Sequence, residues 1–159
     1  MSLSIDYYFA PQSPYAYLGH ERFAAIAREH GATLRVLPVD LGGKVFPVSG
    51  GLPLAKRAPQ RQAYRLVELK RFSEWLGRPL NLQPKFFPVS GDDAAKLIIA
   101  VDLKDGTDAA MKLTGAVMRA VWVQERNIAD EKVLVALLAE QGLAAERSEE
   151  RRVGKECRL

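Results

Sequence analysis

Ser13 and Pro14 stand where a side chain and a helix end could act together on a ligand. They follow the apolar run Tyr7-Tyr8-Phe9 and open an amphipathic segment. Serine is a favoured N-cap residue, and proline is favoured at the first helical position. The hydroxyl would then lie at the positive end of a helix dipole, a place that stabilises a thiolate, a phosphate or a carboxylate. An ordinary helix cap has the same sequence, so both interpretations stay open at this point.

Arginine and histidine residues give weaker indications of chemistry. Arg57, Arg61 and Arg65 recur every four residues and would share one helix face, a pattern typical of a solvated basic surface. His20 and His30 lack the spacing of metal ligands, and both are expected on the surface of the first helix. We therefore predict no metal site.

Composition excludes several classes of function. The 159 residues suit one domain, and 48% hydrophobic with 26% charged residues is typical of a globular protein. The single cysteine, Cys157, excludes an internal disulfide and a Cys-x-x-Cys redox pair. Gly42-Gly43-Lys44 lacks the glycine spacing and the Ser/Thr of a phosphate loop. The net charge of +4 decides nothing by itself, and no nucleic-acid partner is predicted.

Two observations bear on the cellular location. No uninterrupted apolar stretch approaches the roughly 18 residues that span a bilayer. Residues 1–6 lack the basic region and following apolar region of a secretory signal. We therefore expect a cytoplasmic protein with no membrane partner.

Hydrophobic periodicity predicts the elements that must position Ser13. A strand over 4–9, a helix over 14–30 and a strand over 33–39 would form a unit whose two strands are normally parallel. The Gly/Pro-containing connection over 40–58 has a length that tends to be functional. The later elements are four helices and one extended, proline-rich segment: 59–76, 92–106, 107–127 and 130–142, with the extended segment over 78–91.

Local signals add detail to three of these helices. Gly31 is expected at the C′ position that ends the first helix. Trp122 is expected in the core. The apolar residues of the 59–76 helix recur at helical spacing and are expected to face inward: Tyr64, Val67, Phe72, Trp75 and Leu76.

Four segments, in this order along the chain, resemble the 2-hydroxychromene-2-carboxylate isomerases. They are 6–19, Val39-Asp40-Leu41-Gly42, Pro79-Leu80-Asn81 and Pro84-Lys85-Phe86-Phe87-Pro88. That family is grouped with the kappa-class glutathione transferases in the thioredoxin superfamily, beside the bacterial disulfide-forming oxidoreductases. The resemblance extends over about residues 4–143.

This resemblance implies an α/β fold. A thioredoxin-like β-α-β half over 1–40 would be followed by a helical insertion domain, with its long connecting loop, over 41–145. In the family a β-β-α unit then follows, whose cis-proline loop faces the active-site serine. No strand can be read after Gly91, so we expect this C-terminal unit to be missing. The polar segment 146–159 is interpreted as a non-native-looking tail on a truncated frame.

The resemblance also implies a reaction. The family isomerises 2-hydroxychromene-2-carboxylate to trans-o-hydroxybenzylidenepyruvate, in aromatic catabolism, with glutathione as cofactor. Reversible thiolate addition turns a double bond into one that can rotate, and no redox change occurs. A serine can therefore replace the reactive cysteine of the oxidoreductases. Ser13 is the predicted catalytic residue, as a stabiliser of the thiolate and not as a nucleophile.

Further site residues are carried over from the family. Arg61 falls where a lysine that contacts glutathione is common, so Ser13, Pro14 and Arg61 are the predicted glutathione contacts. The residues predicted to line the substrate pocket are Tyr15, Asn81 and Lys85, with Lys85 available to the substrate carboxylate. The expected partner is a small aromatic carboxylate, and a homodimer is compatible with the resemblance.

Two alternatives remain beside this hypothesis. The same activated thiolate would serve a kappa-like glutathione transferase that acts on another electrophile. A chain without the second half of the fold could instead be a fragment without catalysis. A disulfide oxidoreductase is excluded because no cysteine lies near Ser13.

Overall fold

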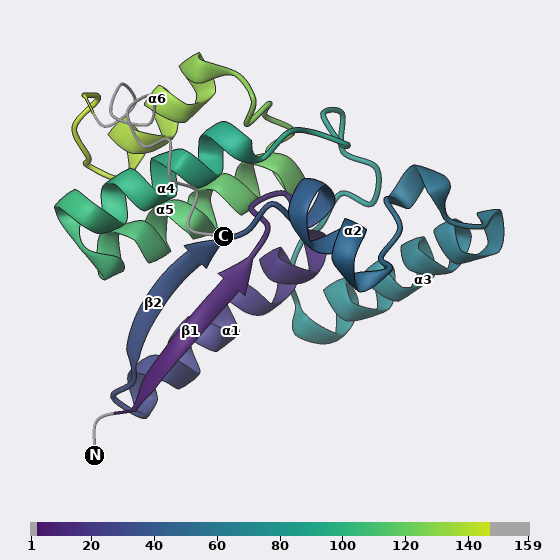
Figure 1. The fold of residues 1–159 in the computed structure, drawn as a ribbon, viewed down its shortest axis with the longest axis horizontal. Coiled ribbons are helices and arrows are strands. Elements are labelled where there is room, and N and C mark those ends of the chain that lie inside the picture. The colour runs from purple at the N-terminus through teal and green to yellow at the C-terminus, as the bar shows by residue number, and fades with distance from the viewer. Residues whose placement is uncertain (1–2, 147–159) are drawn as a thin grey trace.

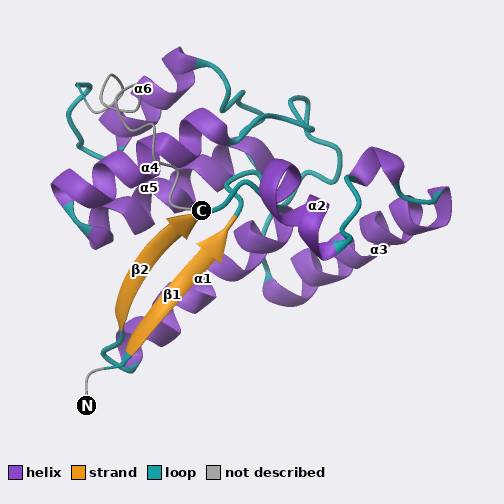
Figure 2. Ribbon diagram, viewed as in Figure 1, coloured by secondary structure: helices purple, strands orange, loops and turns teal. Residues whose placement is uncertain are grey.

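Two parallel strands and the helix between them begin the fold. The computed structural model describes residues 3–146, and its first elements are β1 (Ser4–Phe9), α1 (Pro14–Glu29) and β2 (Thr33–Pro38) (Figures 1 and 2). The strands pair in parallel, which confirms the predicted strand–helix–strand unit. Gly31 follows α1 with a positive φ of 59°, a conformation that glycine adopts without steric cost. It thereby reverses the chain toward β2, as predicted.

Aromatic residues fix β1 against α1. The Tyr7 ring stacks on Phe9 and also meets Phe23 of α1, each at 4.6 Å between ring centroids. Tyr7 lies opposite Val36 of β2, and Val36 and Phe9 are both buried. Because side chains alternate along a strand, Tyr7, Phe9 and Val36 lie on the same face of the sheet. That face belongs to the core.

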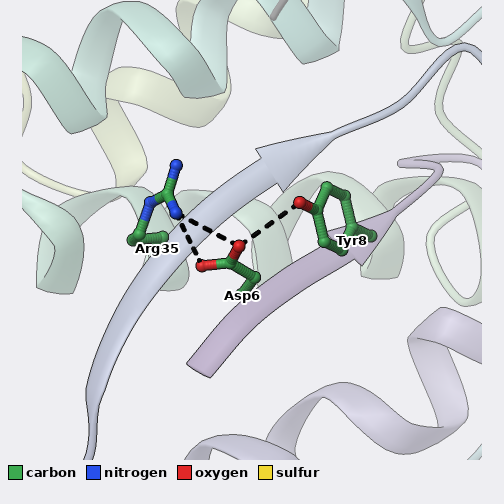
Figure 3. A network of polar contacts seen from close by, with 3 residues as sticks. All are labelled: Asp6, Tyr8 and Arg35. Carbon is green, nitrogen blue, oxygen red and sulfur yellow. Dashed lines mark hydrogen bonds and ion pairs between the residues drawn. The ribbon is translucent and has the colours of Figure 1, made fainter. Parts of the chain in front are cut away.

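The other face of the sheet carries polar residues (Figure 3). Asp6 and Arg35 are register partners, and both carboxylate oxygens lie 3.1 Å from the same guanidinium nitrogen. Tyr8 donates a hydrogen bond of 3.3 Å to the same carboxylate. Since the group is exposed, we expect it to contribute at most about 1 kcal/mol to stability.

A helical layer covers β2 and α1. It comprises α4 (Asp92–Asp105), α5 (Thr107–Trp122) and α6 (Glu131–Glu140). α5 packs against α4, α1, α6 and β2, and nine of its side chains are buried. The predicted core position of Trp122 is confirmed, because that side chain is fully buried.

The remaining helices lie toward the right of Figure 1. A π-helical turn (Leu41–Val45), α2 (Phe46–Ser49) and a 3₁₀ turn (Leu54–Lys56) lead to α3 (Pro59–Leu76). α3 has the predicted bounds and packs mainly against α1. Short helical turns form most of the connection that was predicted over 40–58.

The end of one helix also needs correction. The helix predicted over 107–127 ends at Trp122, and Glu125 beyond it adopts a positive φ of 52°. The expected tail over 146–159 lies outside the described residues, apart from Glu146. Within residues 3–146 the sheet has two strands.

The predicted inward face of α3 was wrong. Trp75 is 72% exposed, Tyr64 is 57% exposed, and Val67 and Phe72 are exposed as well. The side of α3 that is buried instead carries Arg65 and Leu69. Leu76, the fifth residue predicted to face inward, is partly buried against the core, as expected. Periodicity therefore identified an apolar face, but four of its five residues are exposed within residues 3–146.

Candidate functional site

Ser13 is the N-cap of α1. Its backbone is extended (φ −77°, ψ 126°), and its Oγ accepts a hydrogen bond of 3.3 Å from the Ala16 amide. The Ser13 amide donates to the Ala10 carbonyl at 2.9 Å, which closes the turn between β1 and α1. The predicted cap is therefore present, with Pro14 at the first helical position.

Two donors at this cap have no partner within residues 3–146. The Ser13 hydroxyl accepts from Ala16, so its own proton remains available for donation. The Tyr15 amide, in the first turn of α1, has no hydrogen-bond acceptor among the described residues. Both groups lie at the positive end of the helix dipole, and together they could stabilise an anion.

An apolar groove of about 750 Å³ opens beside Ser13. One wall is formed by β1 and the start of α1, and the other by the chain after β2 up to Val48. Ser13 and Lys44 are the polar side chains of the lining apart from the two tyrosine hydroxyls. The full lining is Tyr7, Tyr8, Phe9, Ala10, Ser13, Ala16, Val39, Leu41, Lys44, Val45 and Val48.

Lys44 is a site residue that sequence reasoning missed. The Asp40 carboxylate accepts a 2.7 Å hydrogen bond from the Gly43 amide and begins the turn that carries Lys44. Gly42-Gly43-Lys44 was tested only as a phosphate loop and rejected. Its position directly after a strand that ends beside Ser13 was the available signal, because parallel strands place their carboxyl ends at one edge.

The proline-rich segment reaches the Ser13 turn through Gly91. A Cβ at Gly91 would lie 2.2 Å from Oε1 of Gln12, so a larger residue would have to displace this side chain. That Gln12 oxygen is buried and has no hydrogen-bond partner in the described part of the chain. The segment before α4 therefore packs directly against the residue that precedes Ser13.

Tyr15 lies at the surface, between α1 and α3. It is 42% exposed, and its hydroxyl donates a short hydrogen bond to Glu68. Partial burial, followed by this carboxylate, raises the pKa of Tyr15 to about 12. Tyr15 is thus outside the core, and its side chain is not part of the groove lining.

Arg65 does not belong to a solvated basic face. Its side chain is buried, with the guanidinium 5.3 Å from the Phe87 ring centroid and 5.9 Å from that of Trp122. Burial lowers the pKa of Arg65. Arg57 lies before α3, so the predicted arginine face was wrong. Within residues 3–146 no carboxylate pairs with Arg65.

The other predicted contact residues lie outside the groove lining. Arg61 is exposed in the first turn of α3. Asn81 is tied to the end of α5, because its amide nitrogens donate to the carbonyls of Trp122 and Val123 at 2.8 and 3.3 Å. Lys85 is exposed above the Phe86 ring at 5.3 Å. Their roles in binding stay predictions.

His20 is buried, and its predicted surface position was wrong. One ring nitrogen lies 3.0 Å from the Met111 carbonyl of α5, and the other lies 3.1 Å from the Tyr7 hydroxyl. Since a carbonyl only accepts, Nε2 carries the proton and Tyr7 donates to Nδ1. Burial lowers the pKa of His20 and raises that of Tyr7 to about 12. The ring is a neutral link between β1, α1 and α5.

A larger groove, of about 1170 Å³, lies between α1, β2, α5 and α6. Its charged lining comprises three cationic and three anionic side chains: Arg28, Lys112 and Arg119, and Glu21, Asp108 and Glu140. Opposite charges therefore balance, and the groove has no distinct chemical preference. We place the candidate site at the Ser13 groove because the Ser13 hydroxyl lies at a helix N-terminus and has no acceptor within residues 3–146, whereas the Thr107 hydroxyl in the larger groove donates to Asp102.

Two classes of feature are absent from residues 3–146. No three His, Cys, Asp or Glu side chains gather there in a group that could hold a metal ion. No helix in that range has the length and apolar character needed to cross a membrane.

Comparison with known proteins places this arrangement in a family. Residues 4–157 match the model of the DSBA-like thioredoxin domain. The chain belongs to this family. The β1-α1-β2 unit with the serine cap is thus the start of a thioredoxin-like DsbA fold, and the helices after it give the fold its largely helical character. This confirms the predicted fold class.

Two curated relatives of the chain are an isomerase and a glutathione transferase. It is 26% identical to 2-hydroxychromene-2-carboxylate isomerase of Pseudomonas putida over 137 residues, which cover 86% of this chain and 64% of that protein. It is 27% identical to glutathione S-transferase kappa 1 of Caenorhabditis elegans over 146 residues, covering 87% of this chain and 62% of that one. The chain spans less than two thirds of either relative.

Solved structures agree on the fold. A 2-hydroxychromene-2-carboxylate isomerase superposes with a TM-score of 0.74 at 22% identity, covering 96% of this chain and 72% of that one. The cytosolic disulfide reductase DsbM of Pseudomonas aeruginosa, in a structure with GSH, gives a TM-score of 0.68 at 23% identity, covering 96% and 71%. The DSBA-like fold is therefore shared by isomerases and disulfide reductases.

Proposed function

We propose that this chain carries the thiolate-binding half of a glutathione-dependent isomerase of the 2-hydroxychromene-2-carboxylate type. The observation that carries the proposal is Ser13, whose hydroxyl proton is available at the N-terminus of α1 and at the edge of an apolar groove. A relationship at 26% identity to an isomerase of this type supports it. The cytoplasm is the expected location.

Ser13 has the chemistry that a bound thiolate needs. Bound glutathione would supply the thiolate that adds to a carbon–carbon double bond, allows rotation about it and then leaves. Ser13 would donate its hydroxyl proton to the sulfur, and the Tyr15 amide would add a second donor. A hydrogen bond to a charged group contributes about 1.5–3 kcal/mol, which lowers the pKa of a thiol by about one to two units.

The remaining groups would bind and orient the two ligands. Lys44 lines the same groove as Ser13 and suits a glutathione carboxylate, while Pro14 and Arg61 are the family-derived glutathione contacts. The apolar walls suit the aromatic part of the substrate. Tyr15, Asn81 and Lys85 remain the proposed contacts to the aromatic carboxylate.

Two alternatives compete with this proposal. A kappa-like glutathione transferase would use the same thiolate on another electrophile, and the relationship to glutathione S-transferase kappa 1 favours it as the second candidate. A fragment without catalysis is the third, because the chain spans less than two thirds of its relatives. Product analysis with a chromene carboxylate and with a haloarene separates the first two.

Thiolate formation is the direct test. Glutathione is titrated with the full chain by calorimetry, and the pKa of the bound thiol is followed by the ultraviolet absorbance of the thiolate. Ser13→Ala should raise that pKa by about one unit or more and leave binding largely intact. Absence of glutathione binding to the unmodified chain would favour the fragment without catalysis.

Matched variants separate capping from thiolate stabilisation. Ser13→Asp keeps a good N-cap but offers only an acceptor with a negative charge, so it should preserve stability and raise the thiol pKa further than Ser13→Ala does. Asp130 caps α6 in the same way, by accepting from Lys132 at 2.9 Å. Asp130→Ala should lower stability without moving the thiol pKa. A thiol pKa that is equal in all variants contradicts the role of Ser13.

A further inference from the structure

Arg65 is a buried cation without a counter-charge in the described part of the chain. The residue is only 9% exposed, and within residues 3–146 its side chain makes no hydrogen bond and no ion pair. Its contacts are instead to the rings of Phe87 and Trp122. Removing a charge from water costs free energy unless a partner compensates, and aromatic faces compensate only in part. Arg65 therefore keeps its capacity to bind an anion.

Two neighbours of Arg65 add to the demand for an anion. Burial lowers the pKa of Arg65, and the nearby positive charge of Arg57 lowers it further. An anion beside Arg65 would offset this repulsion between the two arginines. The Nε1–H of Trp122 is a second donor in the same cluster, and it has no acceptor among the described residues.

Glu68 does not supply that anion, although it lies three residues after Arg65 on α3. Its carboxylate accepts the Tyr15 hydroxyl and forms no ion pair with Arg65. The positive charges of Arg65 and Arg57 both act on Tyr15. Because Tyr15 follows Ser13 by two residues, the Arg65 guanidinium lies on the side of the Ser13 turn that faces α3.

The Arg65 guanidinium remains open to a ligand. Within residues 3–146 the side-chain polar atoms that are both unpaired and fully shielded from solvent belong to Gln12, Arg78 and Trp122, so the Arg65 nitrogens are not among them. The planar fork of arginine matches a carboxylate with two parallel hydrogen bonds. Phe87, which is half-buried, offers apolar surface beside it. This combination suits a carboxylate that is attached to an aromatic ring.

We propose that Arg65 anchors a carboxylate subsite that receives an aromatic carboxylate on the α3 side of the Ser13 turn. The proposal rests on the proposed function for the class of ligand. Lys85 is exposed, so water screens its charge far more than that of Arg65. Glutathione also carries carboxylates, and the experiment therefore has to separate these two sources.

Calorimetric titration of the full chain with benzoate, with neutral benzamide and with glutathione is the test. Benzoate should bind about tenfold or more tightly than benzamide. Arg65→Gln should weaken benzoate by about tenfold or more, as the loss of a charge-assisted hydrogen bond does, and should leave the affinities for benzamide and glutathione unchanged. Arg65→Lys keeps the charge without the fork and should recover part of the benzoate affinity. Arg71→Gln, at an exposed arginine of the same helix, is the matched control and should change nothing.

Tryptophan fluorescence places the bound carboxylate. The chain has two tryptophans, so Trp75→Phe leaves Trp122 as the single emitter. Since the Arg65 guanidinium lies 5.9 Å from the Trp122 ring centroid, benzoate at Arg65 should change this emission. Adding Arg65→Gln to the Trp75→Phe chain should abolish the change at the same benzoate concentrations.

Stability separates a binding role of Arg65 from a structural one. Arg65→Met keeps an unbranched side chain against the two rings and removes an unpaired buried charge, so it should not lower the midpoint of urea unfolding. A lower midpoint together with unchanged benzoate affinity would show a purely structural role and overturn the proposal.

Two further results would also overturn it. One is equal affinity of the unmodified chain for benzoate and benzamide. The other is an Arg65→Gln chain that loses affinity for glutathione and not for benzoate. The thiol pKa that tests Ser13 and the benzoate affinity that tests Arg65 are separate measurements, so failure of one proposal is distinguishable from failure of the other.

Discussion

α5 and α3 are helices of similar length in opposite surroundings. α5 has 16 residues and buries nine side chains, whereas α3 has 18 residues and buries two, Arg65 and Leu69. α5 contacts β2 and three helices, while α3 packs mainly against α1. The two helices therefore differ in their contribution to the fold: α5 holds the other elements together, whereas α3 leaves most of its side chains exposed.

The ends of α3 show how a sparsely packed helix is kept in place. Pro59 begins it, and Gly77 ends it in the left-handed conformation. Both residues fix helix boundaries through backbone geometry and need no tertiary partner. On the flank toward α1, α3 is held by the Tyr15–Glu68 hydrogen bond. These local devices hold a helix of which only two side chains are buried.

The two tryptophans give the largest expected difference. Trp122 on α5 is fully buried, with its ring 4.8 Å from that of Phe87, whereas Trp75 on α3 is 72% exposed. Trp122→Ala should cost about 3–5 kcal/mol of unfolding free energy because it leaves a cavity. Trp75→Ala should change it by less than about 0.5 kcal/mol, because that side chain packs little against the described residues. Urea unfolding measures both, and equal losses would break the contrast between the helices.

His20 gives the next largest effect, because it ties α1 to α5 rather than to α3. His20→Gln leaves the buried Met111 carbonyl or the Tyr7 hydroxyl poorly paired, so about 1–3 kcal/mol should be lost near neutral pH. The matched control is His30→Gln, at the exposed end of the same helix.

The same histidine should make stability depend on pH. Burial lowers the pKa of His20 in the folded chain, so below about pH 6.5 the unfolded chain binds a proton that the folded chain does not. The free energy of unfolding should therefore fall as the pH drops below this value. His20→Gln should remove that part of the slope, and His30→Gln should keep it. Identical slopes in both variants would show that His20 does not carry the effect.

Local signals were enough to predict most element bounds. The strand Ser4–Phe9 and the helix Pro59–Leu76 match their predictions because aromatic alternation, proline and glycine act within a few residues. The Ser13 cap was predicted for the same reason. The resemblance of the motifs around it added the fold class, which the match to the DSBA-like family confirms.

Tertiary surroundings could not be predicted in the same way. Periodicity placed Trp75 on an apolar face but could not tell whether anything packs on that face. His20 was expected at the surface because a lone histidine carries no signal that a distant carbonyl, from Met111, will receive its proton. Lys44 was missed because Gly42-Gly43-Lys44 was considered only as a phosphate loop, although it follows β2, which runs parallel to β1.

The smallest expected effect belongs to the link between α1 and α3. Tyr15→Phe removes the hydrogen bond to Glu68 at the surface and should cost at most about 1 kcal/mol. Because partial burial and Glu68 raise the pKa of Tyr15 to about 12, its contribution is present below about pH 10 and is lost as the pH rises through 12. Tyr64→Phe, which changes an exposed hydroxyl on α3, is the control. Should Tyr15→Phe cost as much as His20→Gln, α3 would be held as firmly as α5, and the contrast between a helix that supports the fold and one that presents a surface would fail.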